Sequence, residues 1–254
     1  MHSRGYVRPE HYTGLHVLVI GGNFSATDLV IDLCRHGVRA DISHRKPEPK
    51  LGLPAGVIQY NEPVLFEEDK VYFRGDDVGY RFDVIIFGTG YRYGGNLHFL
   101  APECQVETDE LPRPLHKFLI NPKYPTMAIL NQVGHVASFP LCEYQAIYFQ
   151  KLLLGDIELG SYVDVLSQAW SLTKRKPGWA LKRQYWLNLD QYEYNKSLAT
   201  ESGLEREPAN DHAAHYQLYD IVGIDRLTNP STFRNKEYEF DEETGVYKMT
   251  EDWN

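Results

Sequence analysis

The stretch LHVLVIGGNFSATDLVIDLCRHGVRADIS, residues 15–43, decides the fold of this protein. Residues 15–20 form a short and almost continuously apolar run, which is typical of a strand buried on both faces of a parallel sheet. Over residues 25–36 the apolar side chains recur at helical spacing, and Gly37 supplies the left-handed position that ends such a helix. Residues 38–43 have the pattern of a second strand. The stretch therefore predicts a strand–helix–strand unit with a right-handed crossover.

Prolines follow this unit and exclude a long helix directly after the second strand. The β-rich segments that come next predict a small antiparallel meander at residues 57–60, 64–66 and 71–73. Two further apolar runs are candidate strands, at residues 82–87 and 126–130. Helices are expected at residues 141–154 and 163–173 and within residues 179–199. The acidic tail, residues 231–254, is either an ordered strap or a frayed end.

Together these elements predict an α/β fold. A lead-in segment, residues 1–14, precedes a partial Rossmann-like domain, residues 15–92, which holds the strand–helix–strand unit and the antiparallel meander. A mainly helical segment, residues 93–254, follows. With 254 residues, of which 43% are hydrophobic and 24% charged, the chain has the composition of a globular protein with a sizeable core.

Charge and cysteine content narrow the classes of partner and compartment. The net charge of −9 repels phosphate backbones and anionic lipids, so nucleic acid is not expected as a partner. The three cysteines form no C-x-x-C pair, which indicates free thiols in a reducing compartment. The sequence has no apolar signal region and no run of roughly 20 apolar residues. No transmembrane segment is therefore expected, and the predicted location is the cytoplasm.

The glycine-rich turn between the first strand and the helix is the main candidate binding site. A dinucleotide diphosphate needs free backbone N–H groups at a helix N-terminus. Gly21 permits the tight turn, Gly22 has no Cβ to block the phosphates, and Ala26 lets the helix approach the strand. Asn23 stands where the usual G-x-G-x-x-G/A pattern has its second glycine, and Ser25 opens the helix. The alternative is an ordinary strand-to-helix turn that binds no ligand.

The end of the second strand indicates which dinucleotide would bind. An acid there accepts a ribose hydroxyl in NAD binders, whereas a cation meets the extra phosphate in NADP binders. The strand leaves through His44, Arg45 and Lys46, and the planar guanidinium of Arg45 suits a phosphate. These cations favour NADP(H). The counter-argument is Asp41, which is either a ribose ligand or a strand residue that faces solvent, and the two cations could instead lie in a solvated loop.

Three landmarks in the same order as in the flavin-containing monooxygenases carry a family resemblance. The turn G-G-N-F-S-A-T-D, residues 21–28, resembles that of the family's fungal-type branch, and F-G-T-G-Y, residues 87–91, resembles a second family motif. His2 and Tyr6 are similar to the last two marked positions of F-x-G-x-x-x-H-x-x-x-Y/W. A weaker similarity to P-x-x-E-x-Q extends the resemblance to Gln145.

The resemblance implies a two-cofactor enzyme. In that family FAD lies in an N-terminal Rossmann domain and NADPH in an inserted, smaller one, after which the chain returns to complete the flavin domain. The resemblance therefore implies that residues 93–254 are the C-terminal part of a flavin domain with a helical cap. In the family NADPH reduces the flavin, which then activates oxygen. By resemblance, Thr89, Gly90 and Tyr91 would lie where the two cofactors meet, and Gln145 would lie near a cofactor. From the residues alone, the first three read as a strand that ends in a turn, and Gln145 as a surface polar residue. A second glycine-rich fingerprint is missing from the sequence, so a truncated form without the FAD-binding half is expected.

Two interpretations of function follow. In the first, the chain is a flavin-containing monooxygenase-like protein that oxygenates soft nitrogen or sulfur nucleophiles with NADPH and FAD, and whether it acts alone is left open. In the second, it is a non-catalytic nucleotide-binding or interaction protein derived from that family. In either case another copy or another chain is a possible partner that would cover the missing half. The spacing of the residues assigns no metal site and no catalytic triad.

Overall fold

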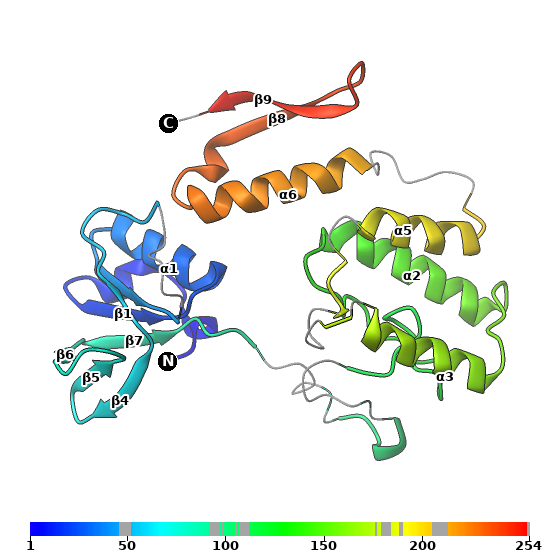
Figure 1. The fold of residues 1–254 in the computed structure, drawn as a ribbon, viewed down its shortest axis with the longest axis horizontal. Coiled ribbons are helices and arrows are strands. Elements are labelled where there is room, and N and C mark those ends of the chain that lie inside the picture. The colour runs from blue at the N-terminus through cyan, green and yellow to red at the C-terminus, as the bar shows by residue number, and fades with distance from the viewer. Residues whose placement is uncertain are drawn as a thin grey trace. The chain divides into compact units, whose positions relative to one another are not determined.

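The computed structural model describes residues 1–45, 52–91, 97, 99–104, 106, 112–175, 177–178, 184–187, 190–204 and 213–252. The chain divides into two compact units. Unit 1 comprises Met1–Tyr91, Ile221–Phe240 and Lys248–Asn254, and unit 2 comprises Arg92–Asp220 and Asp241–Tyr247. The helices and strands of each unit carry the labels of Figure 1.

A four-stranded parallel sheet and one helix form the centre of unit 1. The strand order is β3-β2-β1-β7. The elements are β1 (His16–Ile20), α1 (Phe24–Arg35), β2 (Arg39–Ser43), β3 (Gln59–Tyr60) and β7 (Val84–Phe87). Valines, leucines and isoleucines of β1, α1, β2 and β7 are buried in one cluster. The expected strand–helix–strand unit is confirmed, because both flanking strands and the helix lie within one or two residues of their predicted bounds.

The antiparallel meander is confirmed in part. It consists of β4 (Pro63–Glu67), β5 (Lys70–Phe73) and β6 (Gly79–Arg81), and the sequence pattern did not predict β6. The expectation that residues 57–60 belong to it is wrong. The Ile42 N–H donates to the Ile58 carbonyl and the His44 N–H donates to the Tyr60 carbonyl, so this segment pairs in parallel with β2.

The first residues of the chain pack against the end of β7. The Met1 ammonium donates to the Ile85 carbonyl at 2.7 Å, and the Phe87 N–H donates to the Met1 carbonyl at 2.8 Å. Two short 3-10 helices follow, at Ser3–Gly5 and Pro9–Tyr12. The lead-in segment therefore extends one edge of the parallel sheet.

Unit 2 is mainly helical. Its longer helices are α2 (Ser138–Leu154), α3 (Tyr162–Ser171) and α5 (Asp190–Glu201), and α6 (Ala213–Thr228) begins in it and ends in unit 1. Short 3-10 helices lie at Pro102–Cys104 and Leu172–Lys174. Buried Leu119, Tyr144, Tyr148 and Leu198 form one of its cores. The helices predicted from residues 141 and 163 are confirmed, and α5 overlaps the third predicted region, part of which lies outside the described residues.

The candidate strand at residues 126–130 is wrong. The described residues show only one isolated bridge there, between Ile120 and Ala128, so this apolar segment is held as a loop. The acidic tail is ordered over its described part: a 3-10 turn (Phe233–Asn235) leads into a hairpin of β8 (Lys236–Asp241) and β9 (Val246–Asp252). The three cysteines are free, as predicted. Among the described residues, no helix is long and apolar enough to span a membrane.

Candidate nucleotide-binding site

The glycine-rich bend is the point where two strands and a helix come closest together. The Gly21 N–H donates to the Ser43 carbonyl at 2.8 Å, and the Gly88 N–H donates to the Ile20 carbonyl at 2.7 Å. A Cβ on Gly21 would lie 2.3 Å from the Gly88 carbonyl oxygen, and a Cβ on Gly88 would lie 2.9 Å from the Ala26 Cβ. The three small residues therefore let the end of β1, the end of β7 and the start of α1 meet.

Four backbone amides at this bend are free to bind an anion. Within the described part of the chain, the N–H groups of residues 22–25 donate no hydrogen bond, whereas those of Ala26 and Thr27 both donate to the Asn23 carbonyl. Asn23 and Ser25 are exposed, whereas Gly22 and Phe24 are half-buried. Asn23 is the N-cap of α1, and its side chain makes no capping hydrogen bond. Free amides and the positive end of the helix dipole together favour a phosphate here.

The end of β2 presents a cation beside this bend. A Cβ on Gly22 would lie 3.2 Å from the Cβ of His44, which places the bend directly against the end of β2. Arg45, the next residue, is exposed. His44 itself is buried, and its Nε2 lies 3.1 Å from the Gln59 Oε1. Lys46 lies outside the described residues.

Asp41 is removed from the surface by its own contacts. Its side chain is only 2% exposed, and its Oδ2 lies 2.7 Å from the His16 Nε2. Its Oδ1 accepts the Ile58 N–H at 2.9 Å. The suggestion that Asp41 faces solvent is therefore wrong. Both of its carboxylate oxygens are engaged in contacts within the parallel sheet and its flanking residues. A ribose hydroxyl finds no acceptor in this side chain, which favours NADP over NAD at the end of β2.

The second motif lies at the end of β7, next to the N-terminus. Thr89, Gly90 and Tyr91 are exposed, with 69% of Tyr91 open to solvent. The His2 Nε2 lies 3.2 Å from the Gly90 carbonyl oxygen, and the His2 and Tyr91 rings are 5.0 Å apart. Gly90 has a φ of +86°, and no atom lies within 4 Å of the position that a Cβ would take, so this glycine serves backbone conformation rather than close approach.

Gln145 is an interior residue of unit 2. It is 0% exposed, its Oε1 accepts the Asn131 N–H at 2.9 Å, and its Nε2 donates to the Tyr194 hydroxyl at 2.9 Å. That hydroxyl donates to the Lys117 carbonyl at 2.7 Å. The side chain is neither the surface polar residue that the sequence pattern suggests nor placed to contact a nucleotide. Its polar atoms tie α2 to a loop and to α5.

We expect the substitution Gln145→Ala to destabilise unit 2 by about 1–2 kcal/mol, because it leaves the Asn131 N–H and the Tyr194 hydroxyl without this buried partner. Urea denaturation of the full chain measures the change. The exposed neighbour Glu143 supplies the control: Glu143→Gln should change the free energy of unfolding by less than about 0.5 kcal/mol. Equal effects of the two substitutions would contradict this structural role.

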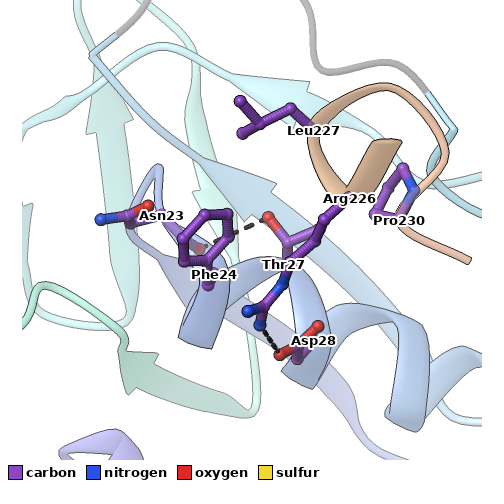
Figure 2. A pocket seen from close by; sticks show the side chains of 7 residues that line it. All are labelled: Asn23, Phe24, Thr27, Asp28, Arg226, Leu227 and Pro230. Atoms are coloured by element: carbon purple, nitrogen blue, oxygen red, sulfur yellow. Dashed lines mark hydrogen bonds and ion pairs between the residues drawn. The ribbon is translucent and has the colours of Figure 1, made fainter. Parts of the chain in front are cut away.

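Two arginines from the far end of the sequence pair with Asp28 in α1, and Figure 2 shows one of them, Arg226. The Arg226 Nη2 lies 2.5 Å from the Asp28 Oδ2, and its guanidinium carbon lies 4.0 Å from the centre of the Phe24 ring. The Arg234 Nη2 lies 3.3 Å from the same carboxylate oxygen. The hollow beside Phe24 and Arg226 holds about 10 Å³, room for about one water molecule. Sequence reasoning missed both arginines, because no local pattern links residues so far apart.

Other candidate chemistry finds no support in the described residues. They contain no group of three or more His, Cys, Asp or Glu side chains that could hold a metal ion. A larger hollow, of about 360 Å³, runs along the outer flank of α1 past Tyr6, Asp32 and Arg35. Its walls do not include the free amides of residues 22–25, so the bend remains the one feature of unit 1 suited to a diphosphate among the residues described.

Curated relatives of this chain are flavin-containing monooxygenases, although no protein-family model matches it. Flavin-containing monooxygenase FMO GS-OX-like 4 from Arabidopsis thaliana is 25% identical in an alignment of 252 residues that covers 93% of this chain and 53% of the relative. Senecionine N-oxygenase from Tyria jacobaeae is 28% identical in an alignment of 181 residues that covers 67% of this chain and 38% of the relative. The chain thus spans about half the length of the curated relatives it matches first.

Solved structures show the same fold. Tmm from Pelagibacter sp. strain HTCC7211 superposes with a TM-score of 0.80 at 20% identity, over 97% of this chain and 55% of that one. S-allyl-L-cysteine S-oxygenase from Allium sativum superposes with a TM-score of 0.73 at 22% identity, over 96% of this chain and 55% of that one. The α/β fold, with its parallel sheet and antiparallel strands, is therefore that of about half of these structures.

Proposed function

The homologues of this chain in sequence and in structure are flavin-containing monooxygenases, and from that premise we propose that the chain binds NADP(H) at the bend between β1 and α1. The observation that carries the proposal is the set of four free amides at residues 22–25, which opens to solvent at the positive end of α1. The expected nucleotide-binding domain, residues 15–92, contains this bend, both flanking strands and the meander.

The chain's own residues suit NADP(H) in three ways. The amides of residues 22–25 bind the diphosphate, Gly22 presents no side chain to it, and Gly21 lets the bend lie against Gly88. Arg45, exposed at the end of β2, meets the additional phosphate that distinguishes NADP from NAD. Asp41 does not compete, because its oxygens are bonded to His16 and to the Ile58 N–H. When bound, NADPH supplies a hydride.

Exposed residues at the end of β7 would orient the reactive end of the nucleotide. Thr89, Gly90 and Tyr91 lie at the same edge of the parallel sheet as the bend, because β1 and β7 run in parallel and end together. The His2 ring holds this turn from one side, through its contacts with the Gly90 carbonyl and the Tyr91 ring. We propose that Thr89 and Tyr91 contact the nicotinamide end, as the family resemblance implies.

The described residues do not fit FAD in the same way. Its diphosphate would need a second bend of free amides between a buried parallel strand and a helix. The parallel sheet of the described chain offers one such bend, at β1–α1, which we assign to NADP(H). We therefore derive no step that involves the flavin from this chain's residues.

For the substrate we propose a small nucleophile with a soft nitrogen or sulfur atom. The support is the pair of relatives whose names state such chemistry, a senecionine N-oxygenase and an S-allyl-L-cysteine S-oxygenase. As part of such an enzyme, the chain would hold and orient the hydride donor. The oxygenation itself would depend on FAD held by residues outside those described.

A second candidate function is a non-catalytic nucleotide-binding protein, and the single diphosphate bend of the described chain favours it. Purified protein distinguishes the two. A flavin absorption band, with or without added FAD, together with FAD-dependent consumption of NADPH, supports the monooxygenase. Colourless protein that NADPH stabilises against heat, but that does not consume it, supports nucleotide binding alone. The absence of any thermal shift with NADPH would contradict both.

We expect the substitution Arg45→Ala to weaken NADPH binding about tenfold and to leave NADH binding within about twofold, because only NADPH carries the phosphate that a guanidinium pairs with. Isothermal titration of both nucleotides measures the difference. Arg81→Ala removes an exposed arginine of the meander, paired with Asp69, and is the matched control. Equal losses for NADPH and NADH in Arg45→Ala would remove the NADP assignment.

A further inference from the structure

The segment Ile221–Phe240 of unit 1 docks on α1 through specific contacts. Arg226 pairs with Asp28 and lies over the Phe24 ring, as Figure 2 shows, and its guanidinium also faces the Phe233 ring at 5.4 Å. Arg234 pairs with the same Asp28 carboxylate, and its guanidinium faces the Phe233 ring at 4.4 Å. We call Arg226, Arg234 and Asp28 the arginine clamp.

Further contacts fix this segment independently of the clamp. The Ser231 hydroxyl donates to the Gly52 carbonyl at 2.8 Å, and Arg35 donates to the Ser231 carbonyl. Pro230 is buried against Gly52, where a Cβ would lie 2.6 Å from the proline Cδ. The segment is therefore seated on both α1 and Gly52.

The arginine clamp acts on the turn that carries the free amides. Phe24 is the first residue of α1, and its backbone N–H is one of the four free amides. Asp28 lies one turn further along the helix. The Arg226 side chain spans the two residues, so it restrains the first turn of the helix at both ends. An ordered turn keeps the amides preorganised, which lowers the entropic cost of binding a phosphate.

The arginine clamp also neutralises the negative charge of Asp28 beside the site. Asp28 alone would place a carboxylate near the helix N-terminus and would repel a phosphate group. Two arginines against one aspartate leave a net charge of +1 at this position, in a chain whose net charge is −9. The local field at the first turn of α1 therefore favours an anion although the whole molecule does not.

We propose that Arg226 is a positioning residue for the nucleotide and that bound nucleotide in turn tightens the docking of the segment Ile221–Phe240. This inference rests on the proposed function. If Arg226 orders the turn that binds the diphosphate, thermodynamic linkage requires the diphosphate to stabilise the contact that Arg226 makes. The clamp thus couples the C-terminal part of the chain to occupancy of the nucleotide site.

Hydrogen exchange of the full chain, with and without saturating NADPH, tests this coupling. In the wild-type protein NADPH should slow exchange at residues 221–240 severalfold. Arg226→Gln should speed exchange of the amides of residues 26–29 about tenfold without nucleotide and should weaken NADPH binding about five- to tenfold. Arg226→Lys keeps the charge and loses the planar group over Phe24. Its exchange rate at residues 26–29 and its NADPH affinity should therefore lie between those of the wild-type protein and those of Arg226→Gln.

Arg234→Gln is the matched control, because it removes an arginine from the same carboxylate without touching Phe24. It should weaken NADPH binding about two- to threefold, through the lost charge, and should leave exchange at residues 26–29 unchanged, because Phe24 keeps its contact with Arg226. Each of three results would overturn the inference. Two concern Arg226→Gln, namely unchanged exchange at residues 26–29 and unchanged NADPH affinity. The third is that NADPH does not change the exchange of residues 221–240 in the wild-type protein. Failure of the proposed function is a separate result, namely that the wild-type protein does not bind NADPH.

Discussion

The substitution Gly21→Ala is expected to destabilise unit 1 by about 2–5 kcal/mol, a large fraction of the stability of an ordinary domain. Gly21 has a φ of +152°, where an L side chain is strained, and its Cβ would lie 2.3 Å from the Gly88 carbonyl oxygen. Strain of about 1–2 kcal/mol adds to overpacking of about 1–3 kcal/mol. The strand β7 cannot retreat, since the Gly88 N–H is bonded to the Ile20 carbonyl at 2.7 Å.

Gly75→Ala is the matched control for this experiment. Gly75 also has a positive φ, of +81°, but nothing lies within 4 Å of its Cβ position, so only the backbone cost of about 1 kcal/mol remains. Urea denaturation of both variants, followed by circular dichroism, gives the two free energies of unfolding. If Gly21→Ala were no less stable than Gly75→Ala, Gly21 and the Gly88 carbonyl would not lie as close together as the structure shows.

The substitution Asn23→Asp is expected to weaken NADPH binding about 30-fold while leaving the protein as stable as before, or slightly more so. An aspartate is as good an N-cap as asparagine, and its charge suits the positive end of α1. The same charge would oppose the diphosphate. At roughly 5 Å and an effective dielectric constant of about 20, two unit charges repel by about 3 kcal/mol, which solvent screening then reduces.

In Asn23→Asp the affinity for NADPH should fall while the stability does not. This combination is informative, because a substitution that merely damaged the site would lower both. Titration with NADPH and thermal unfolding should be measured on the same preparation at one salt concentration. Gln150→Glu, at an exposed position on α2 in unit 2, adds the same charge elsewhere and should leave both quantities unchanged. An unaltered NADPH affinity in Asn23→Asp would mean that the phosphates do not lie at the N-terminus of α1.

Local patterns predicted the centre of the fold because it is local. The run from β1 through α1 to β2 is written in consecutive residues, with apolar spacing for each element and Gly37 at the end of the helix. The pairing of β3 could not be predicted in the same way, since β-rich segments look alike whether they join a parallel sheet or a meander. Of residues 126–130, Ala128 packs against a core of unit 2, and the segment forms one isolated bridge instead of a strand.

In the candidate site, too, the residues that local sequence patterns identify differ from those that they miss. Gly21 and Ala26 could be assigned from the strand-to-helix context, and the structure adds that Gly88 shares their close approach. Arg226 could not be predicted, because its partner Asp28 lies 198 residues away in the sequence. Gln145 illustrates the opposite error: its motif suggested a cofactor contact, whereas burial and two amide hydrogen bonds give it a role in the core.

The central claim is that the backbone amides of residues 22–25 bind the diphosphate of NADPH. Two-dimensional ¹H–¹⁵N NMR of the labelled full chain, titrated with NADPH, observes those amides directly. We predict that the Gly22, Asn23, Phe24 and Ser25 resonances move most and saturate together, downfield as expected for new hydrogen bonds to an anion. Saturable binding of NADPH that leaves these four resonances in place would contradict it.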